Sequence, residues 1–598
     1  MMPLGSTLRQ AVEMHQRGQI HDAQRLYEQI LAVQPHHFDA LHLLGVIAAA
    51  TGNPERAVKL ISTALSIDPN NAIAHNNRGA ALQELGRWEA ALAEFDRAIA
   101  LQSAYSDAHF NRGNVMKDLG RWEDALSSYE RALVLNGNHP EVHCNRGIAL
   151  VALGRHEAAL ASYDRAIALR GDFAAAFYNR GNLLCELRQW DAAIAGFDRA
   201  TALKTDYAAA FSNRGFALLE LQRTAEALAS TDRAIGIKPD YAEAHCNRGG
   251  ILRAMNRLSE ALASYDRAIA LNADYAFAHV NRALVLLLLG EYERGWADHE
   301  WRWKDKHSWI VNERRYFAQP LWLGEDPIAG RTILLQSEQG YGDTLQFCRF
   351  ATLVAARGAQ VILEVPKALA NLLQSLHGVA QVVVQGEPLP PFDCYCPLLS
   401  LPLALKTTLS TIPSAVPYLA SGEERRERWK HKLGDQHRKR VGIVWSSGIR
   451  PERPDLMSAN GRRNIALTKF MALRDQRIEF YSLQKGQHAE SELSELVTAN
   501  RDELGIKDFS ADLHDFADTA ALIEQMDLVI SVDTSTAHLA GALGKPVWVL
   551  LRFDACWRWL TDRDDSPWYP TARLYRQRRA GDWDDVLRRV RDDLLASL

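Results

Sequence analysis

Residues 72–105 read AIAHNNRGAALQELGRWEAALAEFDRAIALQSAY, and this 34-residue unit decides the fold of the N-terminal half. Its tripeptide Asn-Arg-Gly, or the near-copy Asn-Arg-Ala, recurs seven times at a spacing of 34 residues. The asparagines are Asn77, Asn111, Asn145, Asn179, Asn213, Asn247 and Asn281. A fixed period of this length predicts a solenoid of helical repeats. Because the asparagine keeps one place in every repeat, we expect a line of carboxamides along one face.

Residue size repeats as strictly as the asparagine does. Gly79, Ala91, Phe95 and Ala98 have small or aromatic counterparts at steps of 34 residues, and looser copies precede them. The pattern resembles the tetratricopeptide repeat, an all-α solenoid of helix pairs. The small residues let the two helices of a repeat approach closely, and we expect the aromatic residue to fill the gap to the next repeat. The pattern predicts about nine repeats within residues 1–305.

The ninth unit departs from the pattern. Gly295, His299 and Arg302 occupy the places of alanine, an aromatic residue and alanine. The surrounding segment, ERGWADHEWRWK, is rich in tryptophan. We therefore expect this terminal unit to dock onto the next domain and not onto a tenth repeat.

The asparagine line has two interpretations. Each side chain could bond locally within its own repeat. Alternatively, each carboxamide, which carries a donor and an acceptor, could pair with the backbone of an extended peptide in the groove. Protein O-GlcNAc transferases carry a similar asparagine ladder, which favours the second interpretation. An arginine follows each asparagine, and this row either selects acidic segments or forms salt bridges within the array: Arg78, Arg112, Arg146, Arg180, Arg214, Arg248 and Arg282.

Composition excludes several functions. The net charge of −4 and the pI near 6.6 give no bulk electrostatic case for nucleic-acid binding. No apolar run is long enough for a membrane span, and the N-terminal segment lacks the apolar core of a signal peptide. The seven scattered cysteines fit buried thiols in a reducing compartment, so we expect a cytoplasmic protein.

The C-terminal half alternates short apolar runs with helical stretches. Runs begin near Arg331, Val361 and Val382 in one set, and near Arg440 and Leu528 in a second. This alternation predicts parallel sheets covered by helices. Two such α/β domains joined by a linker at 406–439 resemble the GT-B glycosyltransferase fold, with two Rossmann-like domains and substrates between them. We expect an acceptor-side domain at 306–420 and a nucleotide-sugar domain at 421–598.

The segment DLVISVDTSTAHLAGALGKPVWVLL, residues 527–551, carries the most specific motif. It resembles the signature of glycosyltransferase family nine, the heptosyltransferases, with Ser535 in the place of the usual glycine. Hydroxyls and backbone N–H groups at a helix N-terminus stabilise an anion. The resemblance implies that Asp533, Thr534, Ser535 and His538 bind the nucleotide sugar. The alternative is a capped helix with a core histidine.

The segment QSEQGYGDTL, residues 336–345, resembles the first loop of the same family. There an aspartate at the start of the first helix serves as the base, which maps onto Asp343. A carboxylate at a cleft edge can take the proton of an acceptor hydroxyl. Asp343 could instead serve only to cap its helix.

Further residues are expected in the cleft. The segment at Ser447 and Gly448 follows one strand, and the segment at Gln484 and Lys485 follows the next. Their amides and the ammonium could offset diphosphate charge, although Lys485 could also be a plain surface lysine. Arg463 stands where the family places a phosphate-facing cation. The segment WRWLTDRDDSPWYP, residues 557–570, suggests a loop over the cleft whose tryptophans stack on a base or sugar.

The sequence thus predicts a cytoplasmic protein glycosyltransferase. The repeats would hold a polypeptide, and Asp343 and His538 would act in transfer from a nucleotide sugar, with inversion and without a metal ion or other cofactor. Two alternatives remain: a transferase that acts on a surface polysaccharide or lipid-linked glycan, and a scaffold whose transferase half has decayed. The sequence selects neither the sugar, the nucleotide, the acceptor nor the oligomeric state.

Overall fold

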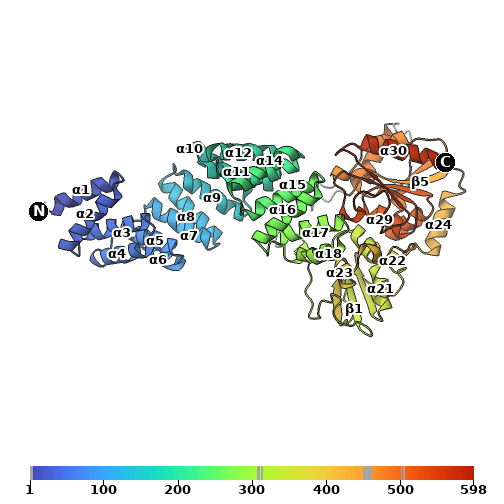
Figure 1. Ribbon diagram of the computed structural model, residues 1–598, viewed down its shortest axis with the longest axis horizontal. Helices are drawn as coiled ribbons and strands as arrows, with labels where there is room; N and C mark the ends of the chain where they lie inside the picture. Colours follow the sequence, from blue (N-terminus) through green and yellow to red (C-terminus); the bar gives the residue numbers. More distant parts are fainter. Residues whose placement is uncertain (1–3, 306–309, 312–313, 449–460, 500–501, 503–504) are drawn as a thin grey trace. The chain divides into compact units, whose positions relative to one another are not determined.

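The computed structural model describes residues 4–305, 310–311, 314–448, 461–499, 502 and 505–598. The chain divides into two compact units, Met1–Ile237 and Lys238–Leu598. Figure 1 labels the elements of each unit. The first unit holds helical repeats, and the second holds further repeats and two parallel sheets. The predicted fold class, tetratricopeptide repeats followed by an α/β GT-B fold, is confirmed. The predicted boundaries at 305 and 420 stay predictions.

The first unit consists of seven helix pairs, each built from a helix of 13 residues and one of 14. Their bounds are Leu4–Gln16 (α1), Ile20–Val33 (α2), Phe38–Ala50 (α3), Pro54–Ile67 (α4), Ala72–Glu84 (α5), Trp88–Leu101 (α6), Ser106–Asp118 (α7), Trp122–Leu135 (α8), Pro140–Ala152 (α9), His156–Leu169 (α10), Ala174–Glu186 (α11), Trp190–Leu203 (α12), Ala208–Glu220 (α13) and Thr224–Ile237 (α14).

The repeated glycine and aromatic residue contact each other within one repeat. A Cβ atom added to Gly147 of α9 would lie 2.4 Å from Cε1 of Tyr163 on α10. The same contact joins Gly113 to Tyr129, with 2.6 Å. The expectation that the aromatic ring fills the gap to the next repeat is therefore incomplete, because the ring first covers the glycine of its own repeat. This fit explains why residue size repeats at these positions.

The second unit begins with two more helix pairs. They comprise Ala242–Ala254 (α15), Leu258–Leu271 (α16), Ala276–Leu288 (α17) and Tyr292–His299 (α18), followed by the 3₁₀ turn Glu300–Trp303 (η1). The last pair docks onto the α/β layers as expected. Trp296 lies 5.3 Å from Trp557, ring centroid to centroid, and Trp568 donates a hydrogen bond to the hydroxyl of Tyr292 over 3.2 Å.

Two parallel sheets follow. The first has the order β3-β2-β1-β4 and the second the order β10-β9-β8-β5-β6-β7, and every pair of neighbouring strands is parallel. The strands are Thr332–Gln336 (β1), Gln360–Val365 (β2), Val379–Val384 (β3), Cys394–Pro397 (β4), Lys439–Val444 (β5), Ile478–Ser482 (β6), Lys507–Asp508 (β7), Leu528–Val532 (β8), Val547–Leu551 (β9) and Ala572–Arg576 (β10). In sheets of this kind, side chains that follow the carboxyl ends of the strands meet at one edge.

Helices and short turns connect the strands. Around the first sheet lie Tyr341–Phe347 (α20), Phe350–Ala356 (α21), Lys367–Leu373 (α22), Leu398–Ser400 (η2), Leu401–Ala404 (α23) and Leu409–Thr411 (η3). Around the second lie Glu423–Leu433 (α24), Leu467–Phe470 (α26), Met471–Leu473 (η5), Gln487–Thr498 (α27), Ser510–Asp512 (η6), Phe516–Glu524 (α28), Ser535–Ala542 (α29), Trp557–Trp559 (η7) and Trp583–Ala596 (α30).

The predicted linker at 406–439 is partly wrong. Its charged run forms α24, which buries Trp429 against Phe509 and pairs Arg428 with Asp518 at 2.5 Å. A single apolar residue in a run of charges shows no clear helical period, so this packed helix could not be predicted from the sequence.

Replacement of Gly147 by alanine should destabilise the first unit by about 1–3 kcal/mol, because the new methyl group meets the buried ring of Tyr163. A thermal melt followed by helical circular dichroism should show a lower midpoint. Gly236→Ala is the matched control, since that helical glycine has open space around its Cβ position. Equal midpoints for the two variants would contradict the fit.

Candidate functional site

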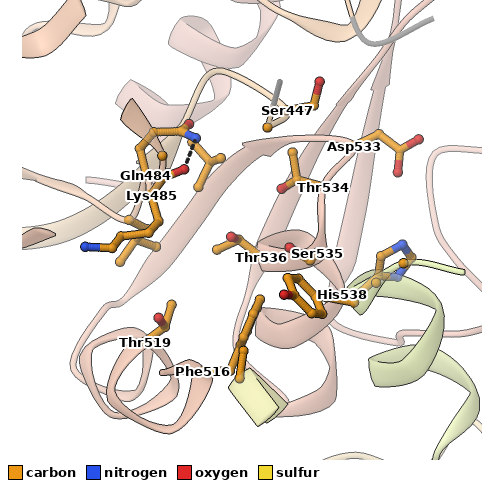
Figure 2. A pocket seen from close by; sticks show the side chains of 18 of the residues that line it. Ser447, Gln484, Lys485, Phe516, Thr519, Asp533, Thr534, Ser535, Thr536 and His538 are labelled. Carbon is orange, nitrogen blue, oxygen red and sulfur yellow. Dashed lines mark hydrogen bonds between the residues drawn. The ribbon is translucent and has the colours of Figure 1, made fainter. Parts of the chain in front are cut away.

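The second unit contains a cleft of about 710 Å³ between the carboxyl ends of its two sheets. The segments that follow β1, β5, β6, β7, β8 and β9 all contribute to its lining, and Figure 2 shows Phe516 and Thr519 after β7 beside residues that follow β5, β6 and β8. The loops bring together all the predicted cofactor-binding residues and both predicted catalytic residues: Asp343, Ser447, Gly448, Arg463, Gln484, Lys485, Asp533, Thr534, Ser535 and His538. Their roles stay predictions, but their common location is a finding.

The N-terminus of α29 forms one wall. Thr534 precedes the helix, and Ser535 and Thr536 occupy its first turn, so their first backbone N–H groups have no partner within the helix. These N–H groups and the three hydroxyl-bearing side chains all belong to the cleft lining (Figure 2). The helix dipole adds partial positive charge at this end, which suits a bound anion.

Asp533 directly precedes Thr534 and this helix N-terminus. Its Oδ1 atom accepts a hydrogen bond from the indole of Trp559 over 2.9 Å, and its Oδ2 atom lies 3.9 Å from Nε of Arg463. Burial by itself would raise the pKa of Asp533, but the charge of Arg463 and the hydrogen bond from Trp559 lower it below its usual value. Asp533 is therefore an ionised, buried carboxylate that orients its neighbours.

His538 is buried and neutral. Burial lowers its pKa to about 4, and Arg558 adds to the effect, whereas Asp533 opposes it. Its Nδ1 atom pairs with the Tyr569 hydroxyl at 3.0 Å, and its ring stacks on Trp559 at 5.2 Å. A neutral ring can donate or accept one hydrogen bond, but it brings no positive charge to a phosphate.

Asp343 stands at the start of α20. Its Oδ2 atom accepts a hydrogen bond from the Gly340 amide over 3.0 Å, so the carboxylate does cap its helix. Its Oδ1 atom forms an ion pair with Arg558, which comes from η7 on the other sheet. Burial would lower the pKa of Arg558, but Asp343 and Cys556 raise it, so this cation stays charged. The capping interpretation of Asp343 is thus confirmed, and its role as a base stays a prediction.

Sequence reasoning missed Arg558. It lies within the tryptophan-rich segment that we interpreted as a loop over the cleft. That interpretation is wrong, because Trp557, Trp559 and Trp568 are buried. They pack on the last repeat and on His538. A lone arginine between buried tryptophans was the available signal for a charged group that must find a partner in the cleft.

The approach of α20 to α29 depends on Gly342. A Cβ atom on Gly342 would lie 3.0 Å from Cδ2 of His538 and 3.5 Å from the Cα atom of Ser535. A larger residue at this position would therefore push the two helices apart.

The remaining predicted residues differ in how they face the cleft. Gln484 is buried and joins two loops, because it accepts from the amides of Trp445 and Ser446 over 3.3 and 3.1 Å. The ammonium of Lys485 donates to the Ser510 carbonyl over 2.7 Å (Figure 2 shows both Gln484 and Lys485). Gln484 is thus a positioning residue, and Lys485 is already engaged.

Arg463 and Ser447 lie across from these residues. The Nε atom of Arg463 is buried and has no hydrogen-bond partner within the described ranges. The backbone and hydroxyl of Ser447 both bond Oδ1 of Asn464 over 2.8 Å. A partly exposed guanidinium with an unsatisfied Nε donor is a favourable place for a phosphate oxygen.

The asparagine line bonds mainly between repeats. Asn111 donates to Asn76 over 3.0 Å, and Asn145 donates to Asn114 over 2.8 Å. Asn77, Asn179 and Asn213 likewise reach the first helix of the preceding repeat, whereas Asn281 bonds its own helix. Neither interpretation anticipated this arrangement, in which the N–H groups hold neighbouring repeats together.

The arginine row forms salt bridges within the array, most of them to an acid on the second helix of the preceding repeat. Arg112 pairs with Asp96 at 2.7 Å, and Arg180 pairs with Asp164 at the same distance. Further pairs join Arg78 to Glu94, Arg146 to Glu130, Arg214 to Asp198 and Arg282 to Asp266 and Asp298. Because these charges are neutralised locally, the interpretation as salt bridges is favoured over selection of acidic segments.

Within the described residues, neither a metal-ligand cluster nor a membrane-spanning helix is present. No three His, Cys, Asp or Glu side chains in these ranges gather as a metal site would require. Among the same residues, no helix has both the length and the apolar character to cross a membrane.

Comparison with known proteins identifies both halves. Tetratricopeptide repeat families match residues 14–79, 70–136, 147–187, 178–242 and 249–290. Glycosyltransferase family 9 (heptosyltransferase) matches residues 488–552, which include the whole of β8 and α29. The chain therefore combines tetratricopeptide repeats with a family 9 glycosyltransferase domain.

One curated protein and two solved structures illustrate the likeness. Protein FlbA of Caulobacter vibrioides is 26% identical over 339 residues, which cover 51% of this chain and 52% of FlbA. The chain thus matches about half the length of that relative. YrrB, described as a TPR protein with an unusual peptide-binding site, is 27% identical over 31% of this chain and 96% of its own, with a TM-score of 0.28. The Cut9–Hcn1 assembly is 16% identical over 45% and 52%, with a TM-score of 0.38.

The stability of the second unit should depend on His538 in acid. Between pH 6.5 and 4, His538 binds a proton in the unfolded chain but not in the folded protein, where its ring is buried. The free energy of unfolding is therefore highest above pH 6.5 and falls as the pH decreases. The loss should approach about 3 kcal/mol. Thermal melts of the wild type and of His538→Asn across this range measure it as a difference in slope. Parallel curves would show that His538 is not a buried neutral group.

Proposed function

We propose that the chain transfers a sugar from a nucleotide sugar to a protein side chain. The observation that carries the proposal is the cleft, which brings Asp343 together with the N-terminus of α29, a helix in the segment that matches family 9. The donor diphosphate binds at Thr534, Ser535 and Thr536, where N–H groups and the helix dipole stabilise it. The Arg463 guanidinium also lines the cleft, and its Nε donor has no hydrogen-bond partner among the described residues. No cofactor beyond the donor is part of this proposal.

Asp343 is the proposed base. It removes the proton from an acceptor serine, threonine or asparagine side chain, whose oxygen or nitrogen attacks the anomeric carbon as the nucleoside diphosphate leaves. A single in-line displacement inverts the configuration. Without donor, Asp343 is neutralised by Arg558. An arriving diphosphate competes for that guanidinium, which frees the carboxylate to act as a base.

The repeats bind the acceptor in this proposal. The carbonyl oxygens of Asn111, Asn145, Asn179 and Asn213 accept no hydrogen bond among the described residues, so they are available to backbone N–H groups of an extended peptide. Because the arginines are already paired, the groove has no strong preference for acidic segments. The seven free cysteines support a reducing, cytoplasmic location for this reaction.

Asp343→Asn should abolish transfer while it preserves donor binding. Loss of a general base typically lowers the rate by a factor of about 10²–10⁴. Mass spectrometry of proteins from cells that produce the wild type or the variant checks glycosylation. A thermal-shift screen with UDP-, ADP-, GDP- and CMP-sugars checks the donor, since saturation at about 100 times Kd adds about 2.7 kcal/mol.

The control for this experiment is Glu387→Gln, an exposed acid in the turn after β3 that is absent from the cleft lining. It should match the wild type in both assays. Unchanged glycosylation by Asp343→Asn would remove the base from the proposal. A wild type that no nucleotide sugar stabilises would contradict the transferase function itself.

Asn145→Ala/Asn213→Ala should raise the KM for the acceptor protein by roughly tenfold, because two hydrogen bonds to its backbone are lost. The KM for the donor should stay unchanged. Asn114→Ala/Asn182→Ala is the matched control, since it removes the partner of Asn145 and one of the two partners of Asn213 but keeps the carboxamides of both asparagines. Equal effects of the two double variants would mean that the asparagine line is only structural.

A further inference from the structure

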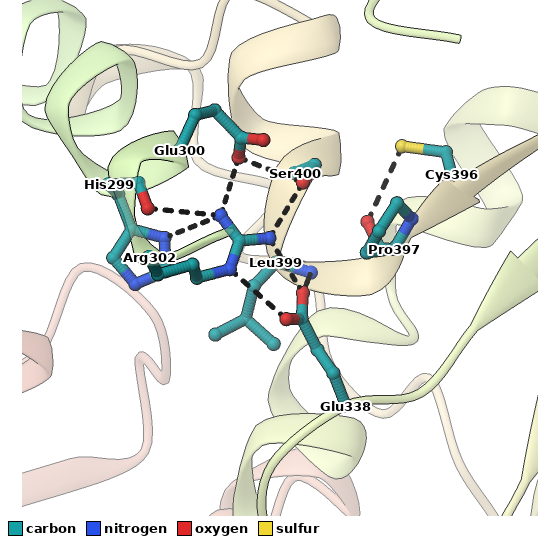
Figure 3. A network of polar contacts seen from close by, with 8 residues as sticks. All are labelled: His299, Glu300, Arg302, Glu338, Cys396, Pro397, Leu399 and Ser400. Atoms are coloured by element: carbon teal, nitrogen blue, oxygen red, sulfur yellow. Dashed lines mark hydrogen bonds and ion pairs between the residues drawn. The ribbon is translucent and has the colours of Figure 1, made fainter. Parts of the chain in front are cut away.

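The last repeat meets the transferase through a buried cluster of charges (Figure 3). Arg302, in η1, is fully buried. Its guanidinium donates to both carboxylate oxygens of Glu338, over 3.1 and 2.9 Å, and to Glu300 over 2.6 Å. It also donates to the Ser400 hydroxyl over 2.7 Å. One side chain of the ninth repeat thus connects two loops at the carboxyl edge of the first sheet.

Burial and neighbouring charges shift the pKa values of two members of this cluster. Burial raises the pKa of Glu338 even though Arg302 opposes this, and burial lowers the pKa of His299 well below its usual value, an effect that the neighbouring Arg302 reinforces. The neutral His299 ring therefore offers its Nδ1 atom to Arg302 at 3.2 Å. Removal of Arg302 or Glu338 alone would leave an uncompensated charge in the interior, which is costly, whereas an apolar pair at both positions would leave only Glu300, whose side chain is 18% exposed and keeps the hydrogen bond from Ser400.

Glu338 stands next to the proposed base. It follows β1 by two residues and precedes Asp343 by five. It also accepts the Leu399 amide over 3.1 Å, so three directional bonds hold its carboxylate. Gln339 lies between Glu338 and Gly340, whose amide donates a hydrogen bond to Asp343. The φ angle of Gln339 is +63°, which is unusual for a residue with a side chain. Such a conformation persists where surrounding contacts hold it.

The contacts that Trp296 and Tyr292 make across this interface are less directional than the ion pair. Trp296 packs on Phe347 and Trp557, and Tyr292 accepts one hydrogen bond from Trp568. Apolar packing is not directional and would suffice for docking. A forked guanidinium–carboxylate pair instead fixes both distance and orientation. The ion pair therefore has a consequence beyond attachment, namely the placement of the loop between β1 and α20.

We propose that Arg302 is a positioning residue, which sets Asp343 for proton transfer by holding Glu338 and the loop between them. This inference rests on the proposed function for its effect on rate. It makes the end of the repeat array part of the transferase machinery. Docking of the ninth repeat and placement of the base are then one event.

The test compares Arg302→Met, Glu338→Met and the double variant in the full chain. Each single variant should lower the melting temperature, and the double variant should recover most of that loss. The kcat for transfer, with the donor that stabilises the wild type, should nevertheless stay about 10- to 100-fold low in the double variant, because the base is misplaced. The donor KM should stay within about threefold of the wild type, since the α29 wall is untouched. Wild-type kcat in the double variant would overturn the proposal.

Two further variants sharpen the result. Arg302→Lys keeps the charge but not the fork, so it should fold and lose part of kcat. Tyr292→Phe removes a hydrogen bond between the last repeat and the transferase that lies outside the charge cluster, and it should keep the wild-type kcat. A fall in kcat with Tyr292→Phe that equals the fall with Arg302→Lys would show that docking alone matters, which overturns the specific role of Arg302.

Hydrogen exchange separates this inference from the proposed function. The amides of residues 339–343 should exchange faster in the double variant than in the wild type and in Tyr292→Phe. This readout needs no substrate. Faster exchange in a chain without transferase activity would support the positioning and reject the function. Unchanged exchange would reject the positioning, whatever the activity.

Discussion

The close approach of α20 and α29 is the contact on which the site depends. Each helix begins at the carboxyl edge of a different parallel sheet, so their N-termini can face one another. The absence of a side chain at Gly342 lets the ring of His538 and the backbone of Ser535 come within van der Waals distance. This contact places a carboxylate, Asp343, beside a helix N-terminus that suits an anion. The geometry supports a reaction in which a proton is taken on one side and a diphosphate leaves on the other.

The same carboxylate is subject to control from two directions. Arg558 reaches it from the second sheet and neutralises it. Arg302 reaches its loop from the last repeat, through Glu338. Both guanidiniums are buried, and buried charges remain only where partners hold them. The proposed base therefore lies where the N-terminus of α29, the first sheet and the last repeat meet.

The candidate site could be predicted where chemistry follows a strand directly. The loops after β1, β5, β6 and β8 were all recognised, because apolar runs followed by glycine or hydroxyl residues are visible in the sequence. Arg558 was missed because its partner, Asp343, lies more than two hundred residues away and only folding joins them. The tryptophans around it were misread for the same reason. A cluster of large apolar residues looks alike in sequence whether it covers a cleft or fills a core.

The sequence by itself determined the repeats, since a period of 34 residues with glycine facing an aromatic ring permits only one local helix pair. It also determined most of the parallel strands, whose buried runs are local signals, but not β4, β7 and β10, which are short or mixed in character. Tertiary structure decided the partners of the polar groups. The asparagine amides bond across repeats, the arginines neutralise acids on neighbouring helices, and Arg302 holds Glu338. Electrostatic partners depend on distance in space, and the order of residues along the chain does not specify that distance.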